Sequence, residues 1–572
     1  MGPFFMRNLR TPLWTPLATA LLSLAWLLPN AHPPWVAFQK DALAASVLLA
    51  CAIPVAWKAF HARVNPRLDP LSLCMLGLAL LTLLQWVGGQ IEFFGHASVG
   101  ALYWIGGALA LMLGSMWARW APDRFLIFLF SAFLVGAVAT AGLMLVQWLG
   151  LNLETVWIAE AVGGRPYGNL IQPNNAASLL LLGFVAVWWL RQKGNISFWP
   201  AMFATAYLLF GVAISGSRIG FLSLTLLLLV VIGSAVRRSE LRLEARTAGA
   251  ILVGFWLTVL LLNSFSDSVT SIGDVRAHAL GRDLANIRLV TYLAFLDAAL
   301  EGPLWGYGFD QAIYAQKVAQ QLGHDVPMYF KWTHNALLDL AVWYGPVVGA
   351  LTAVLLGWWV YRVARSQWSV DLACCLAGLV VLGLHGLVEL PLAYAYFLLP
   401  ACLLAGYVTA QMSFPIIDLP VKSFLLGLLA ASVCLGLVFV DYFKVESSYY
   451  AWRFKQARIG INHPYDVPET IVLNQFRALL VGLRGDAGSL NSKELDDFKF
   501  AVMLQPSPVA LVHLAAIQAR SGMLKEAQET ADVANTIYPA PFGDPMRIRW
   551  QEMAAADQRL KPIRWSENIL KR

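Results

Sequence analysis

The chain has 572 residues, of which 58% are hydrophobic and 13% are charged, and its formal net charge is +7. An average soluble domain is roughly 45–50% apolar and about 25% charged, so these numbers exclude a soluble enzyme. The charges are unevenly placed, because residues 441–572 hold 17 Lys and Arg and 15 Asp and Glu. We therefore expect a membrane domain over residues 1–440 and a water-exposed domain over residues 441–572.

Thirteen apolar segments are predicted to be membrane-spanning helices, because about 20 apolar residues cross ~30 Å of hydrocarbon. They cover residues 12–29, 42–58, 70–88, 98–116, 125–149, 176–190, 198–214, 219–235, 247–264, 335–361, 372–389, 391–410 and 423–440. The first segment lacks a small-x-small cleavage site, so we expect a retained helix rather than a signal peptide. The prediction is an all-α polytopic membrane protein with about thirteen transmembrane helices.

Basic residues in the short loops predict the orientation. With a cytoplasmic N-terminus, the inner loops carry sixteen Lys and Arg and the opposite loops carry three, as the positive-inside rule requires. The loop 265–334 and the C-terminal 132 residues are then expected on the outer side, which is the periplasm in a double-membrane bacterium. The basic excess is explained by topology, so no nucleic-acid partner is expected.

The 70-residue loop 265–334 is expected to form a structured lid, since long loops are uncommon unless they are functional or disordered. The sequence predicts a helix over 284–300, a break at 301–308 and a short helix over 309–321. Arg288 lies on the first helix, in an otherwise apolar stretch where an unpaired charge is costly. It is either a functional group or the partner of a nearby carboxylate, Asp283 or Asp297.

Two further outer segments carry arginine in unusual surroundings. Arg165 lies in the Gly- and Pro-rich segment 163–175, and Arg218 ends the segment 215–218 at the mouth of a span. A guanidinium stays charged and donates bidentate hydrogen bonds, so several converging arginines suit a lipid pyrophosphate. For Arg218 alone, the alternative is an interfacial anchor.

His334 lies where the lid re-enters the membrane, and there it is a candidate general base or hydrogen-bond orienter. The alternative is a helix-capping or merely interfacial histidine. His385 and Glu389 are four residues apart and are expected on one helical face. They form either a buried supporting pair or a second half of the site.

No metal or cofactor is expected from the sequence motifs. The chain has no zincin, nucleophile-elbow or nucleotide-binding motif, and no D-x-D pair on an outer loop. The six cysteines fall in apolar runs, which favours packing over a disulfide framework or a zinc site. Few spans carry an ionisable residue at mid-depth, which argues against an ion-coupled transporter.

Taken in order, these segments resemble the PglL-type bacterial protein O-oligosaccharyltransferases, which belong with the O-antigen ligases and polymerases. The resemblance covers residues ~150 to ~410 and rests on Gly164–Asn175, Ser215–Arg218, Arg288 ahead of Pro303–Gly308, His334–Asn335 and His385–Pro391. It implies a metal-independent, inverting glycosyltransferase of the GT-C type in the bacterial inner membrane. Such an enzyme takes a preassembled glycan from undecaprenyl pyrophosphate.

The resemblance also implies roles for particular residues. His334 corresponds to the essential lid histidine, and Arg218 and Arg288 correspond to the arginines that bind the donor phosphate. Arg165 is expected to assist donor binding. The supporting or substrate-binding residues are expected to be Gln172, Asn174, Tyr167, Asn335, His385 and Glu389.

The acceptor stays open between three kinds of molecule. In PglL-type enzymes it is a Ser or Thr hydroxyl on a periplasmic protein such as pilin, in ligases it is lipid A-core, and in polymerases it is another glycan. Two hypotheses from other functional classes also remain, namely a lipid-linked glycan transporter and a membrane scaffold. Membrane lipids are expected as partners in every case.

The C-terminal domain contains one segment with a repeat-like pattern. Small residues and turn residues at Leu514–Ala515, Gly522, Ala527, Ala534 and Pro539 match a tetratricopeptide helical hairpin near residues 510–539. One repeat is too short for a solenoid, so we expect it to pack on helices from 445–500. It is either a stabilising cap on the lid or a docking site for an acceptor protein.

Overall fold

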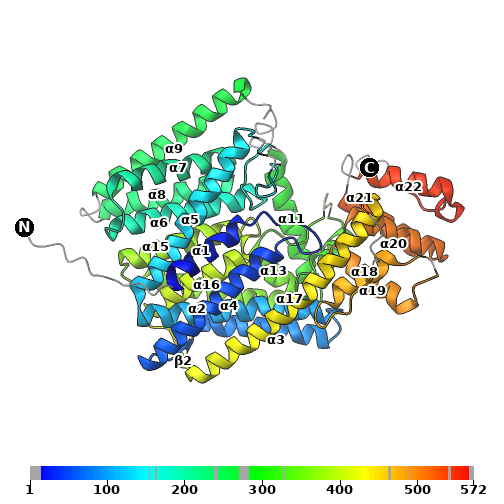
Figure 1. Ribbon diagram of the computed structural model, residues 1–572, viewed down its shortest axis with the longest axis horizontal. Coiled ribbons are helices and arrows are strands. Elements are labelled where there is room, and N and C mark those ends of the chain that lie inside the picture. The colour runs from blue at the N-terminus through cyan, green and yellow to red at the C-terminus, as the bar shows by residue number, and fades with distance from the viewer. Residues whose placement is uncertain are drawn as a thin grey trace, which may run out of the picture. The chain divides into compact units, whose positions relative to one another are not determined.

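The computed structural model describes residues 14–151, 153, 155–161, 164–237, 242–269, 282–324, 326, 329–460, 466–486, 488–538 and 543–565. Gly163 and residues 270–281 of the predicted lid lie outside the described residues. The described part is built from helices (Figure 1), apart from two-residue strands β1 (Arg67–Leu68) and β2 (Ile417–Asp418), which pair antiparallel. The predicted all-α class is confirmed.

The first half of the chain supplies α1 (Trp14–Leu27), α2 (Phe38–His61), α3 (Pro70–Val87), α4 (Phe94–Trp120), α5 (Pro122–Trp148), α6 (Pro173–Gln192), α7 (Phe198–Ser215), α8 (Arg218–Arg237) and α9 (Arg242–Val269). The next helices are α11 (Arg282–Glu301), α12 (Ala312–Gln321), α13 (Ala336–Tyr344), α14 (Pro346–Ala364), α15 (Val370–Gly386), η2 (Pro391–Ala393) and α16 (Ala395–Ala410). The C-terminal part has α17 (Val421–Ala457), α18 (Asn474–Arg484), α19 (Ser492–Leu504), α20 (Pro508–Arg520), α21 (Leu524–Ile537), α22 (Asp544–Ala556) and η3 (Gln558–Leu560).

Among the described residues, nine helices are long and apolar enough to cross a membrane: α2 to α7, α14, α17 and the part of α9 from Glu244 to Ser264. Four shorter apolar helices are α1, α15, α16 and the first part of α8, Arg218–Ser234. Each of the thirteen predicted segments overlaps one of these helices. The protein is therefore a multi-pass membrane protein.

The predicted span 335–361 is divided into two helices, α13 and α14. Gly345 separates them with a left-handed backbone (φ +90), and a Cβ there would lie 1.9 Å from the carbonyl oxygen of Leu304. No residue with a side chain fits that contact. Pro346 then begins α14, since proline is favoured in a first helical turn and disfavours helical backbone in the residue before it.

The chain divides into two compact units, which are described separately. Unit 1 comprises residues 1–76, 105–282 and 355–432, and unit 2 comprises residues 77–104, 283–354 and 433–572. Arg165 and Arg218 therefore belong to unit 1. Arg288 and His334 belong to unit 2.

Helix α6 lies at the centre of unit 1, beside α5, α7 and α8 (Figure 1). Fifteen of its 20 residues are buried. At Gly183 a Cβ would lie 2.3 Å from the Cβ of Ala137 on α5, so glycine permits the close approach of the two helices. The chain just before α6 is thereby anchored to a packed core.

In unit 2, the region after α17 is a set of short helices. Asp441 on α17 accepts hydrogen bonds from the backbone N–H groups of Ile471 and Leu473, each at 3.0 Å, and so fixes the chain entering α18. Helices α20 and α21 pack as a hairpin that turns at Gly522 (φ +83). This hairpin lies at the predicted tetratricopeptide-like segment.

Candidate active site

The segment that carries Arg165 is held by a glutamine from α5. The side-chain oxygen of Gln147 accepts hydrogen bonds from the N–H groups of Tyr167 at 2.9 Å and Gly168 at 2.8 Å. Its amide nitrogen donates to the carbonyls of Ala159 at 2.7 Å and Gly168 at 2.8 Å. Four hydrogen bonds from one side chain thus fix the turn that follows Arg165.

Asn169 holds the same segment from a second direction. Its amide nitrogen donates to the carbonyls of Leu27 at 2.6 Å and Trp157 at 2.9 Å, and its side-chain oxygen accepts from Ala159 N–H at 3.0 Å. The Lys40 ammonium donates to the Asn169 carbonyl. The Asn169 side chain is 1% exposed, so its role is to tie the segment to α1 and α2.

Arg165 reaches the mouth of α7. Its Nε donates to the carbonyl of Ser215 at 3.0 Å, beside Gly216, where the backbone is left-handed (φ +59). Burial lowers the pKa of the Arg165 guanidinium, and the charge of Arg218 lowers it further, while Glu389 opposes both. Two guanidinium groups and one carboxylate therefore lie within electrostatic range of one another in unit 1.

Arg218 is the first residue of α8, and its side chain is exposed. The preceding Ser217 donates from Oγ to Asn174 Oδ1 at 2.8 Å and accepts from Gly220 N–H at 3.1 Å, which joins the start of α8 to the start of α6. A helix N-terminus carries partial positive charge. Together with Arg165 and Arg218 it makes a site suited to an anion such as phosphate.

Two predicted supporting residues, Tyr167 and Gln172, have different surroundings. Tyr167 is 5% exposed, and its hydroxyl donates to the Glu160 carbonyl, which makes it part of the loop framework. The side-chain oxygen of Gln172 is buried without a hydrogen-bond partner in the described part of the chain, and so are both amide atoms of Asn175. Buried polar groups are nearly always hydrogen-bonded, so these amides are candidate substrate contacts.

Glu389 lies one turn beyond His385, as the predicted spacing of four residues requires. Helix α15 ends at Gly386, but the Glu389 N–H still donates to the His385 carbonyl at 2.9 Å. His385 is fully buried, and its Nδ1 lies 2.8 Å from Ser178 Oγ on α6. His385 therefore braces two helices, while Glu389 is the carboxylate that acts on Arg165.

In unit 2, His334 has a left-handed backbone (φ +61), which is uncommon for a residue other than glycine. The Tyr292 hydroxyl on α11 donates to the His334 carbonyl at 3.0 Å. The imidazole packs edge-to-face on Phe330, with ring centroids 5.6 Å apart. Asn335 caps α13 by accepting from two backbone N–H groups, so the alternative role of His334 as the capping residue is wrong.

Arg288 lies on α11, one helical turn before Tyr292 and on the same face. That face is the one from which Tyr292 contacts the His334 backbone. Of the two carboxylates considered as partners of Arg288, Asp297 pairs with His324 at 2.8 Å. The side chain of Asp283 lies outside the described residues.

Two aspartates that the sequence analysis did not single out hold the His334 segment. Asp339 on α13 is 2% exposed and accepts from Thr333 N–H at 2.7 Å. Asp339 could have been noticed in the sequence, because it lies in an apolar helix, where a carboxylate needs a hydrogen-bonding or charged partner.

Asp310 is the second aspartate, and it also has a left-handed backbone (φ +58). Its carboxylate lies 3.4 Å from Lys331 Nζ and 3.7 Å from His96 Nε2, and it accepts from the Trp332 indole. Burial alone raises the pKa of Asp310, but Lys331, His96 and Trp332 outweigh burial and hold the pKa below its ordinary value. The cluster anchors the residues immediately before His334.

Comparisons with known proteins find two matching families and two relatives. Residues 203–353, which include Arg218, Arg288 and His334, match the family described as O-antigen ligase. Residues 373–545 match the family described as virulence factor membrane-bound polymerase, C-terminal. The chain is also 27% identical over 545 residues to a general O-oligosaccharyltransferase of Acinetobacter baylyi, covering 92% of each chain. These matches confirm the resemblance to the PglL-type O-oligosaccharyltransferases.

A second relative is similar to the chain over part of its length. A ComP-specific O-oligosaccharyltransferase of the same organism is 26% identical over 260 residues, which is 44% of this chain and 45% of the relative. Along the chain, the O-antigen ligase match extends from α7 into α14. The polymerase match extends from α15 into α22 and so takes in the C-terminal helices.

The aspartate cluster of unit 2 allows a stability prediction. In Asp310→Asn the left-handed backbone is retained, because asparagine tolerates it, but the charge facing Lys331 and His96 is lost. We expect a destabilisation of about 1–3 kcal/mol. The folded-state pKa is depressed, so the carboxylate of the unsubstituted protein stabilises it above about pH 4 and loses this effect as the pH falls.

The measurement is the thermal unfolding midpoint in detergent, followed by tryptophan fluorescence, for Asp310→Asn and for Asp418→Asn. Asp418 pairs with Arg67 at 3.1 Å, but its side chain is 56% exposed, so its loss should change the midpoint little. Equal midpoints for the two variants would contradict the anchoring role of Asp310.

Proposed function

We propose that the protein is an oligosaccharyltransferase that moves a preassembled glycan from undecaprenyl pyrophosphate to a Ser or Thr hydroxyl of a periplasmic protein such as pilin. The observation that carries the proposal is the similarity to a general O-oligosaccharyltransferase over 92% of both chains. The inner membrane is the proposed location. The N-terminus is cytoplasmic in this proposal, and the segment before His334 and the C-terminal helices face the periplasm.

The arginines are proposed to bind the donor pyrophosphate. Arg165 and Arg218 cluster at the N-terminus of α8 in unit 1, and Arg288 on α11 in unit 2 is proposed as a third donor-binding guanidinium. As the glycosidic bond to phosphate breaks, negative charge develops on the leaving pyrophosphate. Fixed positive groups that stabilise such charge are usually the largest catalytic contribution, so we propose a metal-independent reaction.

His334 is proposed to act on the acceptor hydroxyl. The hydroxyl oxygen attacks the anomeric carbon and forms the new glycosidic bond, while the bond to the pyrophosphate oxygen breaks with its electron pair. The hydroxyl proton passes to the imidazole, or the imidazole orients the hydroxyl for attack. A single displacement of this kind inverts the anomeric configuration.

A ligase is the second candidate, because residues 203–353 match the family described as O-antigen ligase. In that case the acceptor is lipid A-core, and in a polymerase it is another glycan. The donor chemistry proposed above is the same in all three cases. The acceptor must therefore be distinguished by experiment.

Reconstitution separates these candidates. Purified full-length enzyme is incubated with undecaprenyl-pyrophosphate-linked oligosaccharide and either a pilin-like protein or lipid A-core, and glycan transfer is followed by mass spectrometry. We expect transfer to the protein. Transfer to lipid A-core without transfer to protein would assign the chain as a ligase, and chain elongation of the glycan would assign it as a polymerase.

A further inference from the structure

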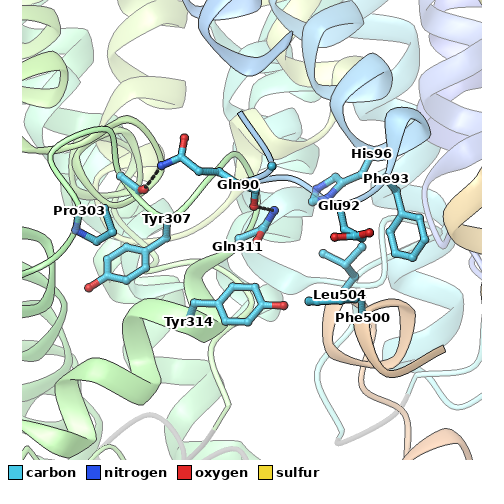
Figure 2. Close-up of a pocket in the computed structure, with 12 residues that line it drawn as sticks. Gln90, Glu92, Phe93, His96, Pro303, Tyr307, Gln311, Tyr314, Phe500 and Leu504 are labelled. Atoms are coloured by element: carbon cyan, nitrogen blue, oxygen red, sulfur yellow. Dashed lines mark hydrogen bonds between the residues drawn. The ribbon is translucent and has the colours of Figure 1, made fainter. Parts of the chain in front are cut away.

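Unit 2 contains a cavity of about 240 Å³ that the proposed reaction does not use. Three segments line it: the turn from Gly89 to His96, the segment from Pro303 to Tyr314, and the end of α19. Figure 2 shows Glu92 and Phe93 just before α4, His96 in its first turn, and Tyr307 and Tyr314 on the opposing segment. Phe500 and Leu504 of α19 complete the wall.

The lining of this cavity combines aromatic rings with polar groups. Tyr307, Tyr314, Phe93 and Phe500 supply rings, and Glu92 is an exposed carboxylate at the rim. Burial raises the pKa of Tyr314 to about 12, and the nearby Glu92 charge contributes, so the phenol stays a neutral donor. None of the twelve lining residues is Lys or Arg, which makes the cavity unsuited to a phosphate.

Hydrogen bonds make the cavity preformed. Gln90 donates from Nε2 to the Gly306 carbonyl at 3.0 Å, and Gln311 donates from Nε2 to the Gln90 carbonyl at 3.2 Å (Figure 2). The Tyr307 hydroxyl donates to the Ala298 carbonyl at 2.7 Å. The planar amides and the Tyr307 ring are therefore held in place before anything binds, which lowers the entropic cost of binding.

The cavity is also tied to the His334 segment within the same unit. Gln311, which lines it, directly follows Asp310, and His96, which also lines it, lies 3.7 Å from the Asp310 carboxylate. The Asp310 carboxylate in turn accepts from the indole of Trp332, two residues before His334. The wall of the cavity is thus connected to the residues just before His334.

We propose that this cavity binds one saccharide ring of the transferred glycan. A pyranose has apolar C–H faces, which pack on aromatic rings, and hydroxyls, which pair with carboxylate, amide and phenol groups. The cavity volume of about 240 Å³ is close to the space that about eight water molecules take up in the liquid, at ~30 Å³ each. It is smaller than the ~300–1,000 Å³ of pockets for drug-sized ligands, which suits a single ring.

An acceptor peptide fits these observations less well. An extended peptide spans about 3.3 Å per residue and needs a groove with backbone hydrogen-bonding partners. The cavity has room for one side chain at most and offers mainly side-chain groups. Because the inference rests on the proposed glycan transfer, its test uses binding as well as turnover.

The test uses purified full-length enzyme in detergent with two probes. The first probe is the free oligosaccharide released by mild acid from the lipid-linked donor, whose contact with the protein is measured by saturation-transfer NMR. The second is the lipid-linked donor itself, whose KM is measured at saturating acceptor protein. The variants are Tyr314→Ala, Tyr314→Phe and Glu92→Ala, with Phe454→Ala as the control. Phe454 is 51% exposed on α17 and lies outside the cavity.

We expect Tyr314→Ala and Glu92→Ala to raise the KM for the donor about five- to ten-fold and to weaken the oligosaccharide NMR signal. Tyr314→Phe should retain most of the binding, because it keeps the ring. Glu92 is exposed, so its variant should fold even if Tyr314→Ala does not. An unchanged NMR signal in both alanine variants would overturn the inference, as would a rise in the KM for acceptor protein alone. Oligosaccharide binding that depends on Tyr314 would support it even if no protein acceptor were glycosylated.

Discussion

Replacing His334 with alanine is expected to reduce glycan transfer by about 100-fold or more, because a positioned general base typically contributes 10²–10⁴-fold. Donor binding should change little, since the arginines remain. The measurement is the initial rate of transfer from lipid-linked oligosaccharide to a pilin-like protein, together with the KM for the donor.

His334→Gly is the matched variant for this experiment. Glycine adopts the left-handed backbone of residue 334 without strain, whereas alanine does not. Both variants lack the imidazole, so both should be equally inactive if the ring itself is needed. A glycine variant with activity near that of the unsubstituted enzyme would show that residue 334 matters only for its backbone conformation, and the proposed role would be withdrawn.

Replacing Arg218 with alanine is expected to weaken use of the donor by about 10–100-fold in kcat/KM, because a hydrogen bond to a charged group contributes about 1.5–3 kcal/mol. Arg218→Lys should recover part of this loss, since lysine retains the charge but not the planar fork. Arg165 remains in both variants, so some pyrophosphate binding should persist. Transfer rates at several donor concentrations separate the effects on KM and kcat.

Arg365→Ala serves as the control for the charge change. Arg365 is an exposed arginine after α14, and its guanidinium donates to the Tyr361 hydroxyl at 2.6 Å. Its loss removes one positive charge without touching the Arg165 and Arg218 group. If Arg365→Ala and Arg218→Ala lowered kcat/KM equally, a specific role for Arg218 in donor binding would be untenable.

Much of the helical framework could be predicted from apolar segments alone, because each span must be about 20 residues of similar hydropathy. The break between α13 and α14 could not, since it depends on the contact between Gly345 and the Leu304 carbonyl. These residues are 41 positions apart in the sequence. Gly345 followed by Pro346 was a local signal for a helix break. The hydropathy averaged over the whole segment does not detect it.

The candidate site shows a similar limit. Arg165 and Arg218 could be selected because arginine near glycine in a loop expected on the outer side is chemically unusual. The anchoring of His334 by Asp310 could not be foreseen, since the carboxylate gathers Lys331 and Trp332 from 21 and 22 residues later and His96 from α4. The left-handed backbone of His334 could not be foreseen either, because residues other than glycine uncommonly adopt it.

The length of α17 has a practical consequence. A helix of 37 residues is about 55 Å long, whereas the hydrocarbon core is ~30 Å thick, so about 25 Å of this helix must project from the bilayer. The projecting part begins near Asp441 and leads directly into the C-terminal helices. In the proposed topology, an added protease should cut within residues 441–572 in spheroplasts without detergent, while inside-out vesicles should protect this region.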